Sequence, residues 1–250
     1  MTGIITLLTD FGTADGYVGE LKGVLATLAP DAQVVDVAHD LAAHDVDAAR
    51  LAVARYWRRF PPGTVHLVVV DPGVGGARAA LAVGCDGRFL VGPDNGVLSP
   101  ALLHPEVQCV SLLVPPGASA TFHGRDVFAP AAAALAGGAA LGSLGSPVAT
   151  PVVRRTPEPI RLADGRIEGE VIGIDRFGNA VTNLMAMRGG TIHVAGMELP
   201  VRRTYGDAPE GSALAVLGSS GLLEIAVRDG RAADRLGVRR GDRIVFQPAG

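Results

Sequence analysis

Residues 66–78 read His66-Leu67-Val68-Val69-Val70-Asp71-Pro72-Gly73-Val74-Gly75-Gly76-Ala77-Arg78. The valine-rich run is typical of a strand buried on both faces of a parallel sheet. The proline and glycines after Asp71 end the strand and permit a sharp turn with close backbone approach. Asp71 is therefore expected at the carboxyl end of a central strand, where open α/β sheets bind their ligands. Arg78 closes the same loop, so the two side chains form either a structural salt bridge or part of a site.

The segments around this stretch alternate between strands and helices. Strands are predicted at residues 4–8, 33–37 and 66–70, and helices at 17–28 and 45–60. Asp45 is the expected N-cap of the second helix. Shorter strands are predicted at 80–83, 89–91 and 107–112, followed by an alanine-rich helix at 125–136. This order predicts an N-terminal α/β domain, residues 1–150, with a central, mostly parallel sheet covered by helices.

A proline-rich, charged segment, residues 150–159, separates this domain from a different pattern. The sequence beyond it predicts short strands at 167–174, 181–185, 191–194, 197–199, 213–217, 222–227 and 243–247. Ala195-Gly196 is expected to form a tight hairpin turn between two of them. We therefore expect a smaller C-terminal antiparallel β domain, residues 160–250, built as a sandwich or a barrel.

The composition narrows the class of protein. Hydrophobic residues make up 48% of the 250 positions and aromatic residues 4%, so the core is mostly aliphatic. A net charge of -3 gives no general attraction for nucleic acid or an anionic membrane. No apolar run approaches the ~20 residues of a membrane span, and the start lacks the features of a signal peptide. With only two cysteines and no metal-like spacing, we expect a cytoplasmic protein without a metal or a disulfide framework.

Three segments of the first domain share one design, an apolar strand that ends in a polar, glycine-bent loop. Their polar residues are Asp10, Asp71 and the pair Asp94-Asn95. If the strands are neighbours in a parallel sheet, these side chains gather along one edge as candidate substrate-binding groups. Carboxylates and amides suit ribose hydroxyls, and they equally suit Mg²⁺. The alternative for Asp94-Asn95 is simple turn formation.

Two further motifs place polar groups where ligands bind. His123 lies in the loop or first turn before the helix at 125–136, so it is either functional or a satisfied structural histidine. In the second domain a carboxylate, an aromatic ring and an amide fall within six residues, at Asp175, Phe177 and Asn179. Ser219 lies in a glycine-flanked turn that offers hydroxyls and backbone N–H groups. Together these motifs suit a small zwitterion, although hydrophilic turns explain either one alone.

Six segments, taken in order, resemble the S-adenosylmethionine hydroxide adenosyltransferases, which are S-adenosylmethionine hydrolases related to fluorinase and chlorinase. The segments are residues 7–12, 69–75, 91–96, 121–126, 174–179 and 218–221, which span almost the whole chain. The resemblance implies hydrolysis of S-adenosyl-L-methionine to adenosine and L-methionine by attack of water on ribose C5′. It also implies that no cofactor is needed, and a homotrimer whose sites lie between the first domain of one subunit and the second of its neighbour.

The same resemblance implies roles for individual residues. The family's water-handling trio of aspartate, arginine and histidine maps onto Asp71, Arg78 and His123, with the general base left open. The implied substrate contacts are Asp10 for the ribose hydroxyls, Asp175 and Ser219 for the methionine ammonium and carboxylate, and Phe177 and Asn179 for the adenine side. The halogenating relatives carry a tyrosine in place of Asp71, and fluorinase carries an arginine in place of Ser220. The alternatives are a halide-dependent 5′-halo-5′-deoxyadenosine synthase and a non-catalytic sensor of adenosine or S-adenosylmethionine.

Overall fold

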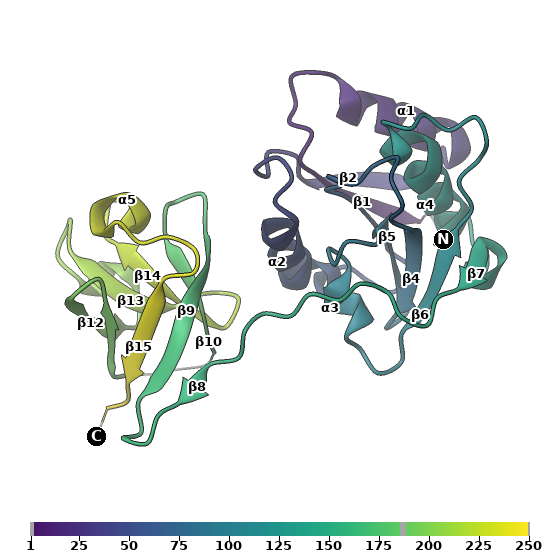
Figure 1. Cartoon of the computed structure of the whole chain (residues 1–250). Helices are drawn as coiled ribbons and strands as arrows, with labels where there is room; N and C mark the ends of the chain where they lie inside the picture. The colour runs from purple at the N-terminus through teal and green to yellow at the C-terminus, as the bar shows by residue number, and fades with distance from the viewer. Residues whose placement is uncertain (1–2, 186–188, 250) are drawn as a thin grey trace. The chain divides into compact units, whose positions relative to one another are not determined.

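The computed structural model describes residues 3–185 and 189–249 and divides the chain into two compact units. The N-terminal unit is Met1–Arg155 and the C-terminal unit is Thr156–Gly250. The N-terminal unit is a sheet with helices, and the C-terminal unit is built mainly from strands (Figure 1). Each unit buries an aliphatic core of its own.

The N-terminal unit is organised around a seven-stranded sheet in the order β2-β1-β3-β5-β4-β6-β7. Its strands are β1 (Ile4–Thr9), β2 (Gln33–Ala38), β3 (Val65–Val69), β4 (Ala80–Cys85), β5 (Arg88–Pro93), β6 (Gln108–Leu112) and β7 (Gly145–Pro147). Strands β2, β1, β3 and β5 are mutually parallel, whereas β4 is antiparallel to β5 and β6, and β7 to β6. The predicted mostly parallel sheet is confirmed, and β3 at its centre is buried along its whole length.

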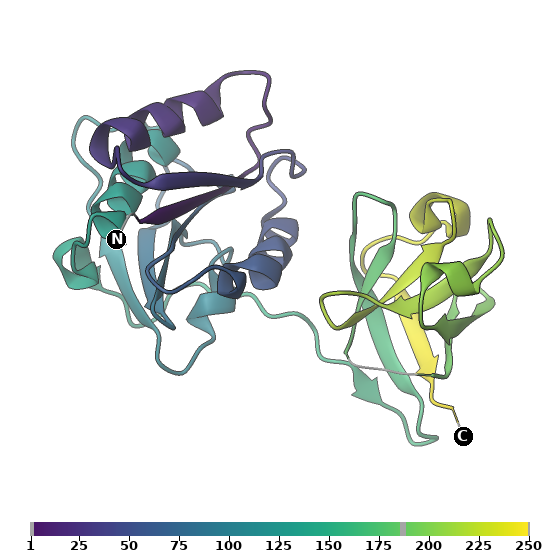
Figure 2. The same cartoon turned by 180° about the vertical axis from the view of Figure 1, so that it is seen from behind.

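Helices cover both faces of this sheet (Figures 1 and 2). On one face lie α1 (Tyr17–Leu28) and α4 (Ala129–Ala136), and on the other α2 (Val46–Tyr56) and the short α3 (Ser99–Leu102). Short helical turns are η1 (Trp57–Arg59), η2 (Gly124–Phe128) and η3 (Leu141–Ser143). As expected, Asp45 caps α2, because its Oδ1 accepts a hydrogen bond of 2.9 Å from the backbone N–H of Ala48.

The C-terminal unit is a closed barrel. Its elements are β8 (Ile160–Arg161), β9 (Ile167–Ile174), β10 (Ala180–Met185), β11 (Thr191–Val194), β12 (Met197–Arg202), η4 (Tyr205–Asp207), β13 (Ala213–Leu217), β14 (Leu222–Val227), α5 (Ala232–Leu236) and β15 (Arg243–Gln247). The sheet runs β10-β14-β13-β12-β11-β15-β9-β8, and pairing of β9 with β10 closes it. Ala195 and Gly196 both have positive φ, as a two-residue hairpin turn requires. The prediction of a small β domain is confirmed, in its barrel form.

The predicted linker is hydrogen-bonded to each unit rather than free. The backbone N–H of Val152 donates to Asp94 Oδ1 at 2.7 Å, and that of Arg154 donates to Ser99 Oγ at 2.8 Å. On the C-terminal unit, Asn183 Nδ2 donates to the carbonyl of Pro157 at 2.9 Å. The linker is therefore hydrogen-bonded to a unit at each of its ends.

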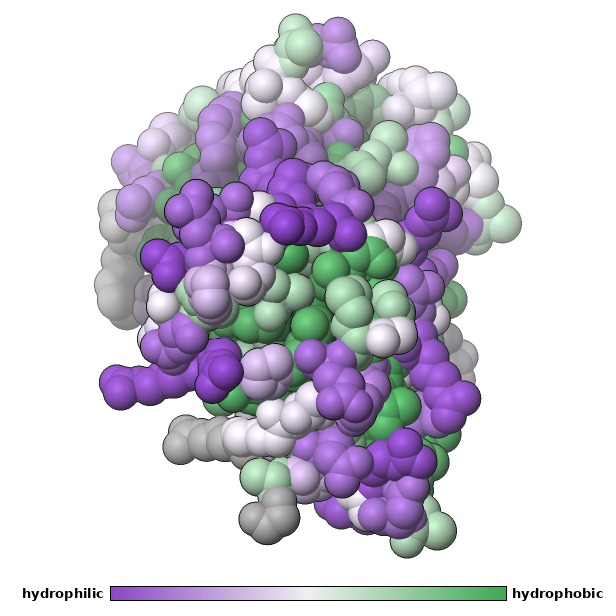
Figure 3. All heavy atoms as spheres, turned by 90° about the vertical axis from the view of Figure 1, so that its left-hand side faces the viewer, coloured by the Kyte–Doolittle hydropathy of each residue, from purple (hydrophilic) through white to green (hydrophobic). Residues whose placement is uncertain are grey.

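Hydrophobic side chains gather near the middle of the face shown in Figure 3, with hydrophilic side chains around them. In the described ranges, no helix combines the length and apolar character needed to cross a membrane.

Candidate active site

The strand register places the polar loop residues along one edge of the sheet. In the parallel pair β1 and β3, Thr9 lies opposite Val69, so Asp10 and Asp71 follow neighbouring strands at the same edge. In the pair β3 and β5, Leu67 lies opposite Val91, which brings the start of the Asp94 loop to this edge too. The edge arrangement predicted from the sequence is thus confirmed, because carboxyl ends of parallel strands coincide.

Arg78 joins Asp71 and His123 into one hydrogen-bonded cluster. Arg78 Nε donates to Asp71 Oδ1 at 3.0 Å, and its terminal nitrogen Nη2 donates to Asp71 Oδ2. The same Nη2 lies 2.9 Å from His123 Nδ1. The side chains of Arg78 and Asp71 are only 10% and 5% exposed. The salt bridge that the sequence offered is therefore present, and with His123 it forms the Asp71–Arg78–His123 cluster; its role as a site stays a prediction.

Glycines in the loop allow this cluster to assemble. Gly75 has φ +73°, and a Cβ at this position would collide with the backbone carbonyl of Ala120. Because only glycine tolerates both conditions, the loop after β3 comes into contact with the segment that leads to His123. At Gly73 a Cβ would lie 3.3 Å from Cγ of Arg78, so a bare backbone leaves room for the arginine stem.

The helix that follows His123 starts with a π-helical turn. His123 is the N-cap of η2, and the backbone N–H of Ala129 donates to the carbonyl of Gly124, five residues earlier. Such turns contain one residue more than an α-helical turn and occur frequently at functional sites. His123 itself is buried, although it precedes the helix at the point where a loop meets it.

The hydrogen bond with Arg78 determines which nitrogen of the neutral His123 ring carries the proton, and the pKa determines whether the ring is charged. A guanidinium can only donate, so the Nδ1 of His123 must accept from Arg78. The neutral imidazole therefore carries its proton on Nε2. Burial lowers the pKa of His123 below its ordinary value, and the positive charge of Arg78 lowers it further. Near neutral pH, His123 is a hydrogen-bond donor at Nε2 rather than a proton acceptor at Nδ1.

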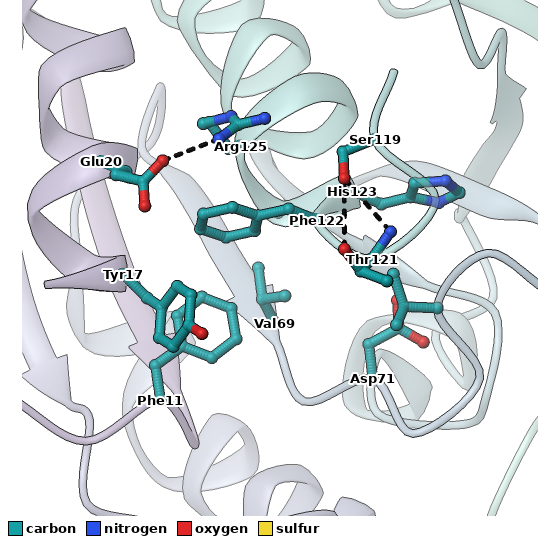
Figure 4. Close-up of a pocket in the computed structure, with 12 residues that line it drawn as sticks. Phe11, Tyr17, Glu20, Val69, Asp71, Ser119, Thr121, Phe122, His123 and Arg125 are labelled. Carbon is teal, nitrogen blue, oxygen red and sulfur yellow. Dashed lines mark hydrogen bonds and ion pairs between the residues drawn. The ribbon is translucent and has the colours of Figure 1, made fainter. Parts of the chain in front are cut away.

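A cavity of about 390 Å³ opens beside the cluster (Figure 4). Asp71 and His123 line it, and Arg78 lies behind them, where its guanidinium also packs 5.2 Å from the ring centre of Phe128. The opposite wall is aromatic. Phe11 and Tyr17 come from one segment of the chain, and Phe122 comes from another. The cavity thus combines a carboxylate and an imidazole with a wall of three rings.

The remaining polar residues at the sheet edge are engaged with backbone groups. Asp10 Oδ2 accepts from the backbone N–H of His44 at 2.7 Å. Asp94 accepts from the linker, and Asn95 Nδ2 donates to the carbonyl of Val70 at 2.9 Å. Asp94 and Asn95 therefore hold the linker and the end of β3, while their predicted contact with substrate stays a prediction. Within the described ranges, His, Cys, Asp and Glu side chains form no group of three that suits a metal ion.

His39 supports the loop that carries Asp10 and Phe11, a role the sequence did not reveal. Its Nδ1 lies 2.8 Å from the hydroxyl oxygen of Thr9, which in turn accepts from the backbone N–H of Phe11 at 3.3 Å. The carbonyl of His39 accepts from the backbone N–H of Gly12 at 2.8 Å. His39 is buried and follows β2, so pairing of β1 with β2 is what brings it to this loop.

In the C-terminal unit, the turn between β9 and β10 carries three of the predicted site residues. Asp175 accepts two hydrogen bonds from Asn179, from its backbone N–H at 2.8 Å and from its Nδ2 at 3.0 Å. Asn179 is buried, whereas the ring of Phe177 is 74% exposed. Asp175 thus fixes the turn that presents Phe177 and Asn179.

Ser219 lies in the turn between β13 and β14. In the β10–β14 pair, Ala180 is opposite Ile225 and Met185 is opposite Leu222. That Asp175 and Ser219 hold the ammonium and carboxylate of the methionine part of the substrate stays a prediction.

A buried carboxylate that the sequence did not indicate lies under the Ser219 turn. Glu224 is 4% exposed and accepts a hydrogen bond of 3.1 Å from the hydroxyl of Tyr205. A Cβ on Gly218 would collide with this carboxylate. Glu224 appears as an ordinary polar residue in an apolar strand, so nothing in its sequence context distinguishes it.

An α/β unit whose sheet edge meets an acid–guanidinium–imidazole cluster, followed by a β-barrel unit, defines a two-domain enzyme class. Residues 5–145 match the SAM hydroxide adenosyltransferase N-terminal domain, and residues 169–245 match the SAM hydroxide adenosyltransferase C-terminal domain. The chain belongs to this family of SAM (S-adenosylmethionine) hydroxide adenosyltransferases, as its sequence motifs indicated.

Individual relatives are consistent with this assignment. A protein of Thermus thermophilus named (R)-S-adenosyl-L-methionine hydrolase is 46% identical, and the alignment covers 95% of this chain and 96% of that protein. A fluorinase of Nocardia brasiliensis is more distant, 28% identical over 89% of each chain. The crystal structure of a conserved protein of Thermotoga maritima superposes with a TM-score of 0.88 at 33% identity, covering 97% of this chain and 99% of that one.

Proposed function

We propose that this chain hydrolyses S-adenosyl-L-methionine to adenosine and L-methionine. The observation that carries the proposal is the Asp71–Arg78–His123 cluster, whose acid and imidazole line a cavity large enough for part of a small ligand. The proposal is also supported by the relative from Thermus thermophilus, which carries the name of such a hydrolase. That name specifies the (R) form of the substrate, and we extend this preference to the present chain.

The reaction is a displacement at ribose C5′. The oxygen of water forms a bond to C5′ while the bond from C5′ to the sulfonium sulfur breaks, and its electron pair stays on the sulfur of L-methionine. The leaving thioether is neutral and needs no general acid. The attacking water loses one proton, so the site must accept a proton and orient the oxygen in line with sulfur.

The hydrogen-bond directions favour Asp71 as the proton acceptor. His123 Nδ1 is occupied by Arg78, and its Nε2 carries a proton, so the imidazole has no free acceptor nitrogen. Asp71 accepts two hydrogen bonds from Arg78, and each carboxylate oxygen keeps a second lone pair. Arg78 acts as a positioning residue for both partners.

The predicted substrate contacts complete this scheme. We propose that Asp10 binds the ribose hydroxyls and that Asp94 and Asn95 support the same edge. Asp175 and Ser219 are proposed for the methionine ammonium and carboxylate, and Phe177 with Asn179 for the adenine ring. These last groups belong to the C-terminal unit. We propose that they form a substrate site together with the N-terminal unit of a neighbouring subunit in a homotrimer. The proposed place of action is the cytoplasm.

A chromatographic product assay tests the proposed reaction. Purified protein without added metal or halide is expected to convert S-adenosylmethionine to equal amounts of adenosine and methionine. Formation of 5′-chloro-5′-deoxyadenosine only when chloride is present would indicate the halide-dependent alternative. Tight binding without turnover over hours would indicate the sensor.

Mixing of two inactive variants tests the shared site. Asp71→Asn and Asn179→Ala damage different units, so a mixed trimer contains some sites with two intact halves. Co-refolded chains are expected to regain part of the activity, whereas sites built within single chains would stay inactive. Light scattering gives the oligomeric state independently.

A further inference from the structure

The aromatic wall of the cavity forms a corner of three rings. The ring centres of Phe11, Tyr17 and Phe122 lie 5.5–6.0 Å apart in every pair, with interplanar angles of 63°, 76° and 88°. Rings that meet nearly at right angles present both edges and faces toward the space between them. In Figure 4 the three rings lie on one side of Val69, and Asp71 and His123 lie on the other.

The construction of the corner depends on a glycine. A Cβ on Gly124 would lie within 3.3–3.4 Å of Phe122, Phe11 and the side chain of Val69. The bare backbone at Gly124 therefore lets side chains from the loop after β1, from β3 and from the segment before η2 converge at one point, next to His123. This convergence connects the aromatic corner directly to the reacting end of the cavity.

One ring of the corner already binds a cation. The guanidinium of Arg125 lies 5.0 Å from the ring centre of Phe122. Arg125 is itself neutralised by ion pairs with Glu20 and Asp126, each 2.7 Å long. Phe122 therefore acts as a cation acceptor in this structure, and the charge of the guanidinium beside it is balanced by two carboxylates.

We propose that Phe11, Tyr17 and Phe122 form the subsite for the sulfonium group of the substrate, an assignment that rests on the proposed function. A sulfonium is permanently positive and has no hydrogen-bond donor, so water and carboxylates solvate it poorly compared with an ammonium. Aromatic faces attract such a cation, most strongly when it is desolvated. The neutral thioether that forms on reaction loses this attraction, and the corner therefore binds the substrate more tightly than methionine.

Binding measurements with two probes test the subsite. The probes are S-adenosylmethionine and the neutral thioether S-adenosylhomocysteine, measured by calorimetry on the full chain carrying Asp71→Asn to suppress turnover. Tyr17 is 47% exposed, so substitution there is compatible with folding. Tyr17→Leu is expected to weaken binding of the sulfonium by about three- to tenfold and leave the thioether within about twofold.

Matched variants separate charge recognition from apolar contact. Tyr17→Phe keeps the ring and is expected to preserve the preference for the sulfonium, and Phe122→Leu is expected to reduce it as Tyr17→Leu does. Equal losses for both probes, or no loss for either, would overturn the subsite. Because the readout is affinity, absence of hydrolysis in the unmodified chain would overturn the proposed reaction without deciding this assignment.

Discussion

Arg78 Nη2 lies 2.9 Å from His123 Nδ1 while the same guanidinium holds both oxygens of Asp71. One donor-only group thus fixes the orientation of an acid and the tautomer of an imidazole. This arrangement assigns different roles to residues that the sequence could only group together, and each role leads to a measurable expectation.

Asp71→Asn is expected to lower kcat by about 10²–10⁴-fold, the usual contribution of a general base. The amide keeps the shape of the side chain but no longer accepts a proton, so KM is expected to change little. Asp164→Asn, in an exposed turn where the aspartate pairs with Arg166, is the control and is expected to keep full activity. Loss of less than about tenfold in Asp71→Asn would exclude Asp71 as the base.

The pKa of His123 is expected to depend on the charge of residue 78. Burial and the Arg78 charge lower this pKa below its ordinary value, so the imidazole is neutral at pH 7. Arg78→Gln removes the charge and is expected to raise the pKa, whereas Arg78→Lys is expected to keep it low. NMR titration of the His123 ring proton, assigned by comparison with His123→Gln, measures the shift. Identical titration in all three proteins would contradict the proposed electrostatic coupling.

Buried His66 is expected to make the fold sensitive to acid. Burial lowers its pKa to about 4, so between pH 6.5 and pH 4 the unfolded chain binds a proton that the folded chain does not. The free energy of unfolding should therefore fall by about 2 kcal/mol from pH 7 to pH 5 through this group alone. Urea titrations measure the change, and His66→Gln should flatten it. An equally steep dependence in the variant would assign the acid sensitivity to other groups.

Gly75→Ala is expected to disrupt the cluster more than it disrupts the fold. Its Cβ would push against the carbonyl of Ala120 and separate the Asp71 loop from the segment before His123, so activity should fall more than tenfold. Gly63→Ala is the matched control, because Gly63 has φ +86° and open space around it. That variant should lose only roughly 1 kcal/mol of stability from the left-handed backbone and keep its activity. Comparable activity losses in the two variants would show that the contact with Ala120 is unimportant.

The sequence predicted the elements whose signals are local. The helix α1, Tyr17–Leu28, has the predicted bounds, and Asp45 caps α2 as expected. The short α3 and α5 were not predicted, because four or five residues show no helical period. The strand-end aspartates were visible for the same reason, since each follows an apolar run at a proline or glycine turn.

Contacts between distant segments were beyond prediction. His39 contacts Thr9 across 30 positions of the chain, and Tyr17 contacts Phe122 across more than 100. Residues so far apart form no periodic pattern or short motif from which their contact could be predicted. Asp94 was read as a ligand-binding residue, yet its nearest observed partner is the linker.

The π-helical turn after His123 makes the cluster sensitive to chain length. Its extra residue is accommodated ahead of α4, whose alanines are fixed in the core. Deletion of a single residue in this turn would restore ordinary helical winding and shift His123 by about 1.5 Å along the helix axis relative to α4. A one-residue change in chain length, with no substitution of Asp71, Arg78 or His123, is thus expected to disturb their cluster while the fold is kept.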